Sequence, residues 1–326
     1  MPVASDTTSL RLRVIRKTAL TQSAALLHLA GADGRALPGW EPGAHVELRL
    51  PSGLRRPYSL CGDPAARDTY AVCVQREESG RGGSVEAHDR LRVGTEIGSS
   101  APRNHFPLRD ASDYTLIAGG IGITPLKAMA EELHRRGASW RLVYGGRSLR
   151  SMAFARELAA AHPGRVTLVP QDEAGLPDLD RVVGSSSPDT RLYCCGPGPM
   201  LSAVMETCTR AGVADRLHME RFSAAEDPPG SGADADSDSA FEVELRRSGT
   251  SLKVAAGQSL LEAIRAVRPD IDSSCQEGYC GTCETRVLEG EPEHRGSLLS
   301  PEEHEEEGTM LICVGRARSE RLVLDL

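Results

Sequence analysis

The sequence has no apolar run long enough to cross a lipid bilayer, and its first residues, MPVASDTTSLRLRV, lack the apolar core of a signal peptide. We therefore expect a cytoplasmic protein that does not enter a membrane. Thiols stay reduced in the cytoplasm, so clustered cysteines are better interpreted there as metal ligands or catalytic groups than as disulfides. Internal repeats are also absent, as are a C-x-H…C-x2-H Rieske ligand pair and a haem-thiolate signature.

The chain also lacks an excess of positive charge, with 38 Lys and Arg against 46 Asp and Glu and a net charge of −8. Residues 1–222 carry 28 Lys and Arg against 24 Asp and Glu, a net charge of +4, whereas residues 223–326 carry 10 against 22, a net charge of −12. This asymmetry argues against nucleic-acid binding by the C-terminal part. It suits docking onto a basic protein surface, because charge steers encounter, although a solvated acidic face is the simpler alternative.

A chain of 326 residues suits two or three domains. Residues 223–240, SAAEDPPGSGADADSDSA, contain no large apolar residue and are predicted to form a flexible linker. Residues 241–326 then form a separate module. The strand-like FEVELRR and RLVLDL and the helix-like SLLEAIRAV indicate an α+β domain there.

The part before the linker changes its pattern near residue 111. In residues 1–110, short alternating runs such as LRLRVI, HVELRL and YAVCVQ are separated by turn signals, which is typical of an antiparallel barrel or sandwich, and we predict a β-barrel. In residues 111–222, the apolar runs YTLIAGG, WRLVYGG, VTLVPQ and RLYCCGPG alternate with helical stretches. Such alternation predicts an α/β domain with a parallel sheet covered by helices.

Four cysteines have the spacing Cys275-x4-Cys280-x2-Cys283-x29-Cys313. A C-x4-C-x2-C run with a distant fourth cysteine is the ligand spacing of a plant-type [2Fe–2S] centre. We expect glycines 278 and 281 to adopt left-handed backbone angles and to bring N–H groups close to the sulfurs.

The alternative for this loop is a structural zinc site. Zinc loops pair C-x2-C with a second close pair of ligands, and a lone fourth cysteine fits that arrangement poorly. His294 and His304 are nearby in the sequence, but histidines in an acidic loop are more often solvated than bound to metal.

The run LIAGGIGITPL places Gly119, Gly120 and Gly122 after an apolar strand and before a helix. Such a strand–turn–helix lets a pyrophosphate approach the backbone at a helix N-terminus. The run YCCGPGPM ends a second strand, which should finish at the same carboxyl edge. Cys195 is then positioned to lie against a nicotinamide ring, with a packed core thiol as the alternative.

A two-electron hydride donor cannot feed a one-electron cluster directly, so a flavin is the expected chemical link. The run RRPYSLC offers the positive charge of Arg56, the flat face of Tyr58 and the hydroxyl donor of Ser59. The run RGGS, residues 81–84, is suited to an anion nest for a terminal phosphate. The alternative for the first run is an ordinary β edge.

Taken in order, the motifs RPYSL, GRGGS, GGIGITP, YCCGP and HMERF, the four cysteines and the ending RLVLDL are similar to those of a known family. The chain resembles the reductase components of two-component Rieske oxygenases, of the phthalate dioxygenase reductase and vanillate O-demethylase reductase type. The resemblance implies an NADH-dependent oxidoreductase with FMN and a [2Fe–2S] cluster, NADPH being the alternative donor. It also implies a monomer whose electron acceptor is a separate oxygenase, either a Rieske oxygenase or a cytochrome P450.

The resemblance further implies a set of site residues. The flavin and its phosphate would be bound by Arg56, Pro57, Tyr58, Ser59, Val74, Arg81, Gly82, Gly83 and Ser84. The nicotinamide nucleotide would be framed by Gly120, Thr124, Arg147, Cys195 and Pro197, with Phe222 and Thr124 near the flavin. Ser59 and Cys195 would position and tune the reacting groups at the catalytic centre rather than react themselves. Gln75 stands where relatives often carry Lys, which removes one cationic phosphate contact.

Two other functions remain open at this point. One is a flavin reductase of a small acceptor such as ferric iron or oxygen. The other is a non-catalytic binding protein with a structural zinc in the cysteine loop.

Overall fold

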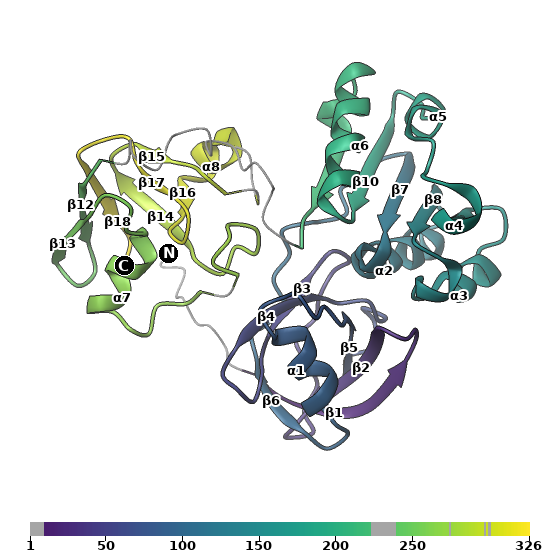
Figure 1. Cartoon of the computed structure of the whole chain (residues 1–326), viewed down its shortest axis with the longest axis horizontal. Coiled ribbons are helices and arrows are strands. Elements are labelled where there is room, and N and C mark those ends of the chain that lie inside the picture. The colour runs from purple at the N-terminus through teal and green to yellow at the C-terminus, as the bar shows by residue number, and fades with distance from the viewer. Residues whose placement is uncertain (1–9, 223–238, 274, 297, 299–300) are drawn as a thin grey trace. The chain divides into compact units, whose positions relative to one another are not determined.

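A computed structural model describes residues 10–222, 239–273, 275–296, 298 and 301–326, without the side chains of residues 301 and 302 (Figure 1). The chain forms two compact units, Met1–Glu220 and Arg221–Leu326, and each is described by itself. Most of the predicted linker, residues 223–238, lies outside the described residues.

The first sheet of unit one is antiparallel, and its six strands follow the order β4-β3-β6-β1-β2-β5. An isolated bridge between Leu60 and Val72, together with a 2.9 Å hydrogen bond from Cys61 N–H to Ala71 O, joins the two edge strands. The sheet therefore closes into the predicted barrel. Its strands are β1 (Leu10–Ala19), β2 (Ala24–Gly31), β3 (His45–Arg49), β4 (Arg55–Ser59), β5 (Thr69–Gln75) and β6 (Glu96–Ser99).

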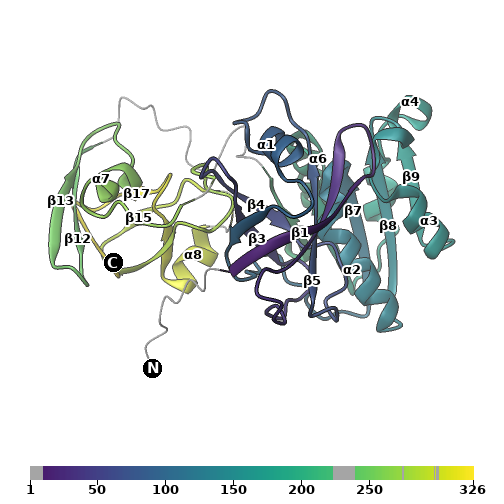
Figure 2. The ribbon, with the colours of Figure 1, turned by 90° about the horizontal axis from the view of Figure 1, so that it is seen from below.

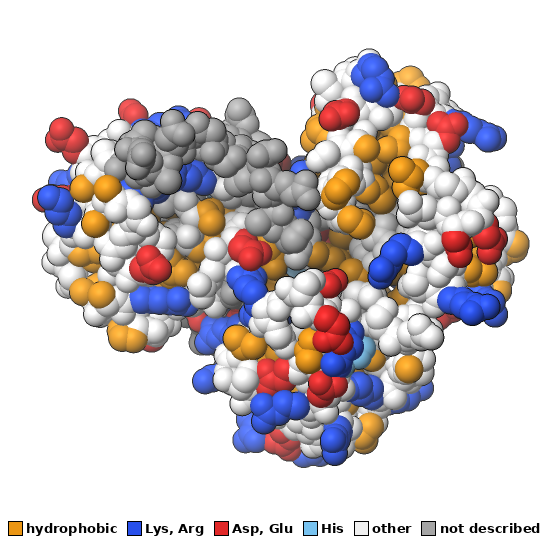
Figure 3. Space-filling view, in the orientation of Figure 1, with side chains coloured by type: hydrophobic (Ala, Val, Ile, Leu, Met, Phe, Trp, Pro, Cys, Tyr) orange, Lys and Arg blue, Asp and Glu red, His pale blue; other side chains and the backbone are white. Residues whose placement is uncertain are grey.

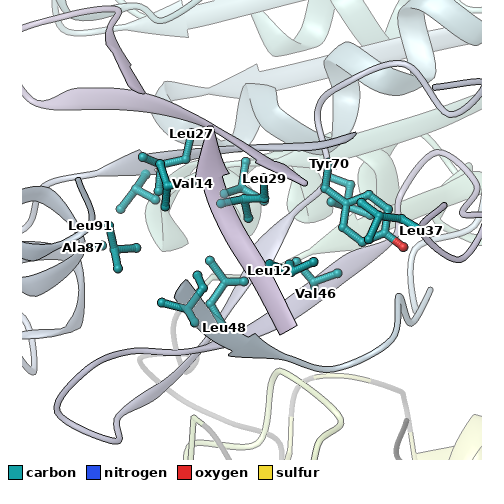
Figure 4. Close-up of a cluster of buried hydrophobic side chains, with 14 of the residues drawn as sticks. Leu12, Val14, Leu27, Leu29, Leu37, Val46, Leu48, Tyr70, Ala87 and Leu91 are labelled. Atoms are coloured by element: carbon teal, nitrogen blue, oxygen red, sulfur yellow. The ribbon is translucent and has the colours of Figure 1, made fainter. Parts of the chain in front are cut away.

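Inward-facing side chains fill the barrel. In β1, Leu12 and Val14 are buried and alternate with exposed arginines, as a half-buried strand requires. Figure 4 shows them gathered with Leu27, Leu29 and Leu48 from neighbouring strands. This apolar core fixes the barrel as a scaffold for the residues on its outer rim.

Helix α1 (Gly83–Arg90) packs on the barrel through the buried Ala87. Lys17 Nζ of β1 donates hydrogen bonds to the carbonyl oxygens of Ala87, His88 and Leu91 at the C-terminal end of this helix. A cation at that end satisfies orphan carbonyls and complements the helix dipole. The helix that begins within the RGGS run is thereby held against the barrel.

The second sheet of unit one is parallel and follows the order β11-β10-β7-β8-β9. Helices α5 and α6 pack on one face, in a cluster that includes Ile117, Leu192 and Leu201. Helix α2 contacts β7 and β8, and its Ala128 belongs to the barrel core. The strands are β7 (Asp113–Gly119), β8 (Ser139–Gly146), β9 (Val166–Pro170), β10 (Thr190–Cys195) and β11 (Leu217–Glu220), and the helices are α2 (Ile123–Arg135), α3 (Ala155–Ala161), α4 (Gln171–Ala174), α5 (Leu179–Gly184) and α6 (Gly198–Arg210) (Figure 2).

Unit two has a five-stranded mixed sheet in the order β13-β12-β18-β14-β16 and a two-stranded pair, β15-β17. Helix α7 (Leu260–Val267) begins with a capping box in which Ser259 and Glu262 satisfy each other's backbone N–H groups. The remaining elements are β12 (Phe241–Leu245), β13 (Thr250–Val254), β14 (Glu284–Glu289), β15 (Pro292–Glu293), α8 (Pro301–Glu307), β16 (Thr309–Leu311), β17 (Arg316–Ala317) and β18 (Arg321–Leu324).

These sheets confirm the predicted multidomain fold class of an antiparallel β-barrel, an α/β parallel sheet and an α+β module. Charged side chains of both signs are interspersed over the face of unit one seen in Figure 3. No helix among the described residues is long and apolar enough to span a bilayer.

Candidate functional site

The cysteine loop of unit two brings all four predicted ligands into the interior. The four thiols are buried and free of disulfides. Cys275 forms side-chain hydrogen bonds with Cys280 and Cys313, and Cys313 forms one with Cys283, so the four sulfurs form one contiguous group. Among the described residues, no three His, Cys, Asp or Glu side chains are arranged around a single metal ion.

Backbone geometry explains how the loop turns around the sulfurs. Gly278 and Gly281 have φ angles of 75° and 72°, which confirms the predicted left-handed conformation. A Cβ on Gly278 would lie 2.7 Å from Val314 Cγ2 and 2.9 Å from a backbone atom, so only glycine fits there. The amide of Glu277 points at Cys275 Sγ at 3.4 Å, as predicted for groups that tune a cluster. Four sulfurs with backbone donors are a donor set that fits a [2Fe–2S] centre.

In unit one, the turns after β7 and β10 meet at the carboxyl edge of the parallel sheet. A Cβ on Gly122 would lie 2.2 Å from Cys195 O, and a Cβ on Gly119 would lie 2.7 Å from Pro197 Cδ. Ala118 is in register with Cys195. The sequence prediction that both strand ends share one edge is thus correct, and the glycines allow the close approach of the two turns.

The residues assigned to the nicotinamide nucleotide surround this edge. Gly120 has a φ of 54°, and its carbonyl accepts a 3.0 Å hydrogen bond from Tyr144 Oη. Thr124 is buried, and its Oγ1 donates to Ile121 O at 3.0 Å, so the hydroxyl is occupied within the turn. Pro197 is the N-cap residue of α6. Arg147 follows β8 and is exposed, which leaves its guanidinium accessible to a ligand.

The barrel carries the flavin candidates on β4 and at the start of α1. Arg56 Nη2 donates to Arg81 O at 3.2 Å, and a Cβ on Gly83 would lie 2.6 Å from Arg56 Nε. Gly82, the N-cap residue of α1, has a φ of 78°, and no described side chain caps that helix. The first-turn N–H groups therefore remain available for an anion beside Arg56. The structure makes this run the beginning of a helix, whereas the sequence suggested only a nest.

The remaining flavin candidates differ in what they can offer. Burial raises the pKa of Tyr58 to about 12, so its ring stays neutral. Pro57 lies beside Tyr58 on β4. Ser84 Oγ accepts a hydrogen bond from Glu77 N–H at 3.0 Å, so its hydroxyl is partly occupied. Val74 is buried in the barrel core, and its carbonyl lies 2.8 Å from His88 Nε2.

A carboxyl group that we did not single out in the sequence lies between the two predicted catalytic residues. Glu220 Oε2 is 3.5 Å from Ser59 Oγ and 4.0 Å from Cys195 Sγ. Cys195 and Glu220 end adjacent parallel strands in register, so the sheet itself pairs them. The short strand β11 ends with Glu220 at the functional edge. This position at a strand end was the signal from which the sequence could have identified Glu220. Phe222 belongs to unit two.

The environment of this trio disfavours the charged forms of Glu220 and Cys195. Burial raises the pKa of Glu220 to about 8, and the hydrogen bond from Ser59 opposes that shift. Burial, followed by the nearby Glu220, also raises the pKa of Cys195 well above the ordinary value of a thiol. The site therefore presents a hydroxyl, a thiol and a carboxyl that is mostly protonated at pH 7.

Comparison with known proteins agrees with this geometry. A family described as "2Fe-2S iron-sulfur cluster binding domain" matches residues 243–318, and one described as "Oxidoreductase NAD-binding domain" matches residues 116–206. The first match includes all four cysteines, which favours iron–sulfur over zinc. The second contains the turns after β7 and β10.

Whole-chain relatives extend these matches. Phenoxybenzoate dioxygenase subunit beta of Ectopseudomonas oleovorans is 43% identical over 92% of this chain and 91% of its own length. The structure of an intact type IV self-sufficient cytochrome P450 monooxygenase is 38% identical with a TM-score of 0.90, and it covers 100% of this chain and 43% of that longer chain.

A third match carries the family assignment. The structure of phthalate dioxygenase reductase is described as modular for electron transfer from pyridine nucleotides to [2Fe–2S]. It is 36% identical with a TM-score of 0.71 over 98% of both chains. The predicted resemblance and the predicted enzyme class are therefore confirmed: the chain is an oxidoreductase that belongs to the phthalate dioxygenase reductase family.

Proposed function

We propose that the protein oxidises NADH and delivers electrons singly to a separate oxygenase component, with FMN and a [2Fe–2S] centre as resident redox groups. The observation that carries this proposal is the Ser59–Glu220–Cys195 trio at the carboxyl edge of the nucleotide-binding sheet. When bound, the flavin takes two electrons as hydride and returns them one at a time. The family supports the assignment, because its described member moves electrons from pyridine nucleotides to [2Fe–2S].

The donor set fits a flavin mononucleotide. Arg56 and the N-terminal turn of α1 would hold the phosphate, supported by Arg81, Gly82, Gly83 and Ser84. Tyr58 offers a neutral aromatic face, with Pro57 beside it, and Val74 would contribute through its backbone. Phe222 is proposed as a further contact to the flavin.

The trio prepares the place where hydride moves. Ser59 donates to Glu220, so its hydroxyl orientation is fixed by the carboxyl. Because Glu220 is mostly protonated at pH 7, its own O–H can donate a hydrogen bond within the site. Cys195 remains a thiol, so it fills space beside the nucleotide and does not attack it. These residues orient the reacting groups and exclude charge and water.

The nucleotide is proposed to be NADH, bound along the turns that carry Gly120, Thr124 and Pro197. The exposed Arg147 would meet the pyrophosphate. The ratio of kcat/KM for NADH to that for NADPH tests this choice. A ratio above one supports NADH, and a ratio below one would reassign Arg147 to a 2′-phosphate.

A Rieske oxygenase is the proposed acceptor. A cytochrome P450 is the second candidate, favoured by the match to a self-sufficient P450. Reduction of a small acceptor is tested by deleting residues 241–326. The proposal predicts that the deletion variant still reduces ferricyanide with NADH but loses cytochrome c reduction. Full cytochrome c reduction by that variant would favour the small-acceptor function.

Three further properties belong to the same proposal. Its domains are residues 1–110, 111–222 and 241–326, joined by the linker at residues 223–240, and limited proteolysis should cut within that linker. The protein is proposed to be cytoplasmic, which is consistent with nine cysteines that form no disulfide in the described chain. It is proposed to be a monomer, so sedimentation should give a mass near 34.9 kDa.

A further inference from the structure

Unit two contains a pocket of about 440 Å³, and none of the four cysteines lines it. It lies where β14 ends and where α8 meets β16. The pairing of β14 with β18 shifts register between Val287 and Glu289, which leaves Leu288 42% exposed in the pocket wall. Gly290 follows with a φ of 97°, and a Cβ there would lie 2.3 Å from Arg321 O. The hollow is therefore built by a bulge and an obligatory glycine.

His304 lines this pocket and has one buried nitrogen without a hydrogen-bond partner. Its side chain is 1% exposed, and its Nε2 has no hydrogen-bond partner. Thr309 Oγ1 donates to Glu284 Oε1 at 2.7 Å, so its single proton is used there. His304 Nδ1, 3.2 Å from the same hydroxyl, must then be the donor. The tautomer follows from this network and leaves Nε2 with a lone pair that lacks a donor.

A second ring keeps His304 in place and uncharged. His294 is buried and stacks on His304 with ring centroids 4.7 Å apart and an interplanar angle of 7°. Burial, and then the neighbouring imidazole, lowers the pKa of His304 to about 4. At neutral pH His304 Nε2 can therefore only accept a hydrogen bond, so a ligand must supply the donor group.

The charge of the lining selects a cation. The lining includes three carboxylates, those of Glu289, Glu291 and Glu305, and a single guanidinium, that of Arg318. Glu289 is already paired with Arg246 at 2.7 Å, so Glu291 and Glu305 are the exposed carboxylates left for a ligand. Val287, Leu288 and Pro292 supply an apolar wall for an aliphatic stem. An anion would meet carboxylates and a lone pair and is disfavoured.

From these contacts we infer that the pocket receives a Lys or Arg side chain from the protein that accepts electrons from this reductase. The inference rests on the proposed function. It is supported by the net charge of −12 over residues 223–326, which complements a basic partner surface. Thr309 in the pocket wall donates to Glu284, the residue after the ligand Cys283, so a partner anchored here is held on the strand that leads to the cluster.

The test uses oxidised mitochondrial cytochrome c, a lysine-rich redox protein, and measures its Kd for the immobilised full-length holoprotein. Glu291→Gln and Glu305→Gln should each weaken binding about threefold, and the double variant about tenfold. The matched control is Glu307→Gln, which removes an exposed carboxylate of the same helix that does not line the pocket, and it should leave the Kd unchanged.

A competition experiment identifies the recognised group. N-acetylarginine amide should displace cytochrome c from the wild-type protein and not from the double variant, whereas N-acetylcitrulline amide, uncharged and of the same shape, should not displace it. Equal displacement by the two amides, or an equal Kd change for Glu305→Gln and Glu307→Gln, would overturn the inference. NADH-dependent ferricyanide reduction, measured in parallel, tests the proposed function separately, because ferricyanide does not need the pocket.

Discussion

Replacement of Glu220 by Gln should stabilise unit one, by an amount that depends on pH. The pKa of this carboxyl is about 8 in the folded protein, against an ordinary value of 4.5. Below pH 4.5 the carboxyl is protonated in both the folded and the unfolded state, so it does not lower the free energy of unfolding. As pH rises towards 8 the unfolded chain ionises while the folded chain does not, so the wild-type protein loses stability over this range.

The magnitude follows from the same two pKa values. Each pKa unit corresponds to about 1.4 kcal/mol, which gives an upper bound of about 3 kcal/mol at pH 7. With a folded-state pKa of about 8 the carboxyl is mostly protonated at pH 7, so we expect a value close to this bound, about 3 kcal/mol. Gln cannot ionise. The difference in unfolding free energy between Glu220→Gln and wild type should therefore be near zero at pH 4.5 and about 3 kcal/mol at pH 7.

Tryptophan fluorescence during urea unfolding is a suitable assay. The chain has two tryptophans, Trp40 and Trp140, and both are buried in unit one. Flavin-free protein should be used, because a bound cofactor shifts stability by mass action. Glu206→Gln, an exposed position on α6, is the matched control. A gap between Glu220→Gln and wild type that stays constant from pH 5 to pH 7.5 would refute the argument.

Three further outcomes are expected. Gly122→Ala should raise KM for NADH about tenfold or more, because its Cβ would lie 2.2 Å from Cys195 O. The control is Gly184→Ala, whose Cβ meets nothing within 4 Å, so this variant should bind NADH normally. Equal effects of the two substitutions would contradict the close-approach argument. Cys313→Ser should abolish the paramagnetic resonance signal of the reduced cluster while flavin absorbance remains, and a retained signal would remove Cys313 from the ligand set. The pKa of His304 falls from 6.5 to about 4 on folding, so unit two should keep its full stability above pH 6.5 and lose about 2 kcal/mol of unfolding free energy by pH 5. Loss of visible cluster absorbance during urea unfolding would report this change. His304→Gln should remove the pH dependence, and an unchanged slope would exclude His304 as its source.

Much of this architecture was readable from the sequence because local patterns determine it. The alternation in LRLRVI and HVELRL corresponds to inward-facing side chains of β1 and β3. The spacing of the four cysteines predicted the sulfur group, and Gly278 and Gly281 have the backbone angles expected of them. In each case the residue types suit only one local geometry.

The features that were missed depend on distant contacts. The tautomer of His304 is decided by tertiary pairing with Thr309. The position of Glu220 between Ser59 and Cys195 requires the strand order β11-β10, which the sequence does not state. Likewise, His294 and His304 were expected to be solvated, and the structure buries both of them, because they stack within the fold of unit two.

The most direct test of the account is an anaerobic visible spectrum of the purified protein before and after one equivalent of NADH. We predict overlapping flavin and [2Fe–2S] bands that bleach together within seconds. Cluster bands that remain oxidised while the flavin bleaches would contradict electron delivery to the four cysteines. A protein that binds no flavin when FMN is supplied would contradict the proposed function as a whole.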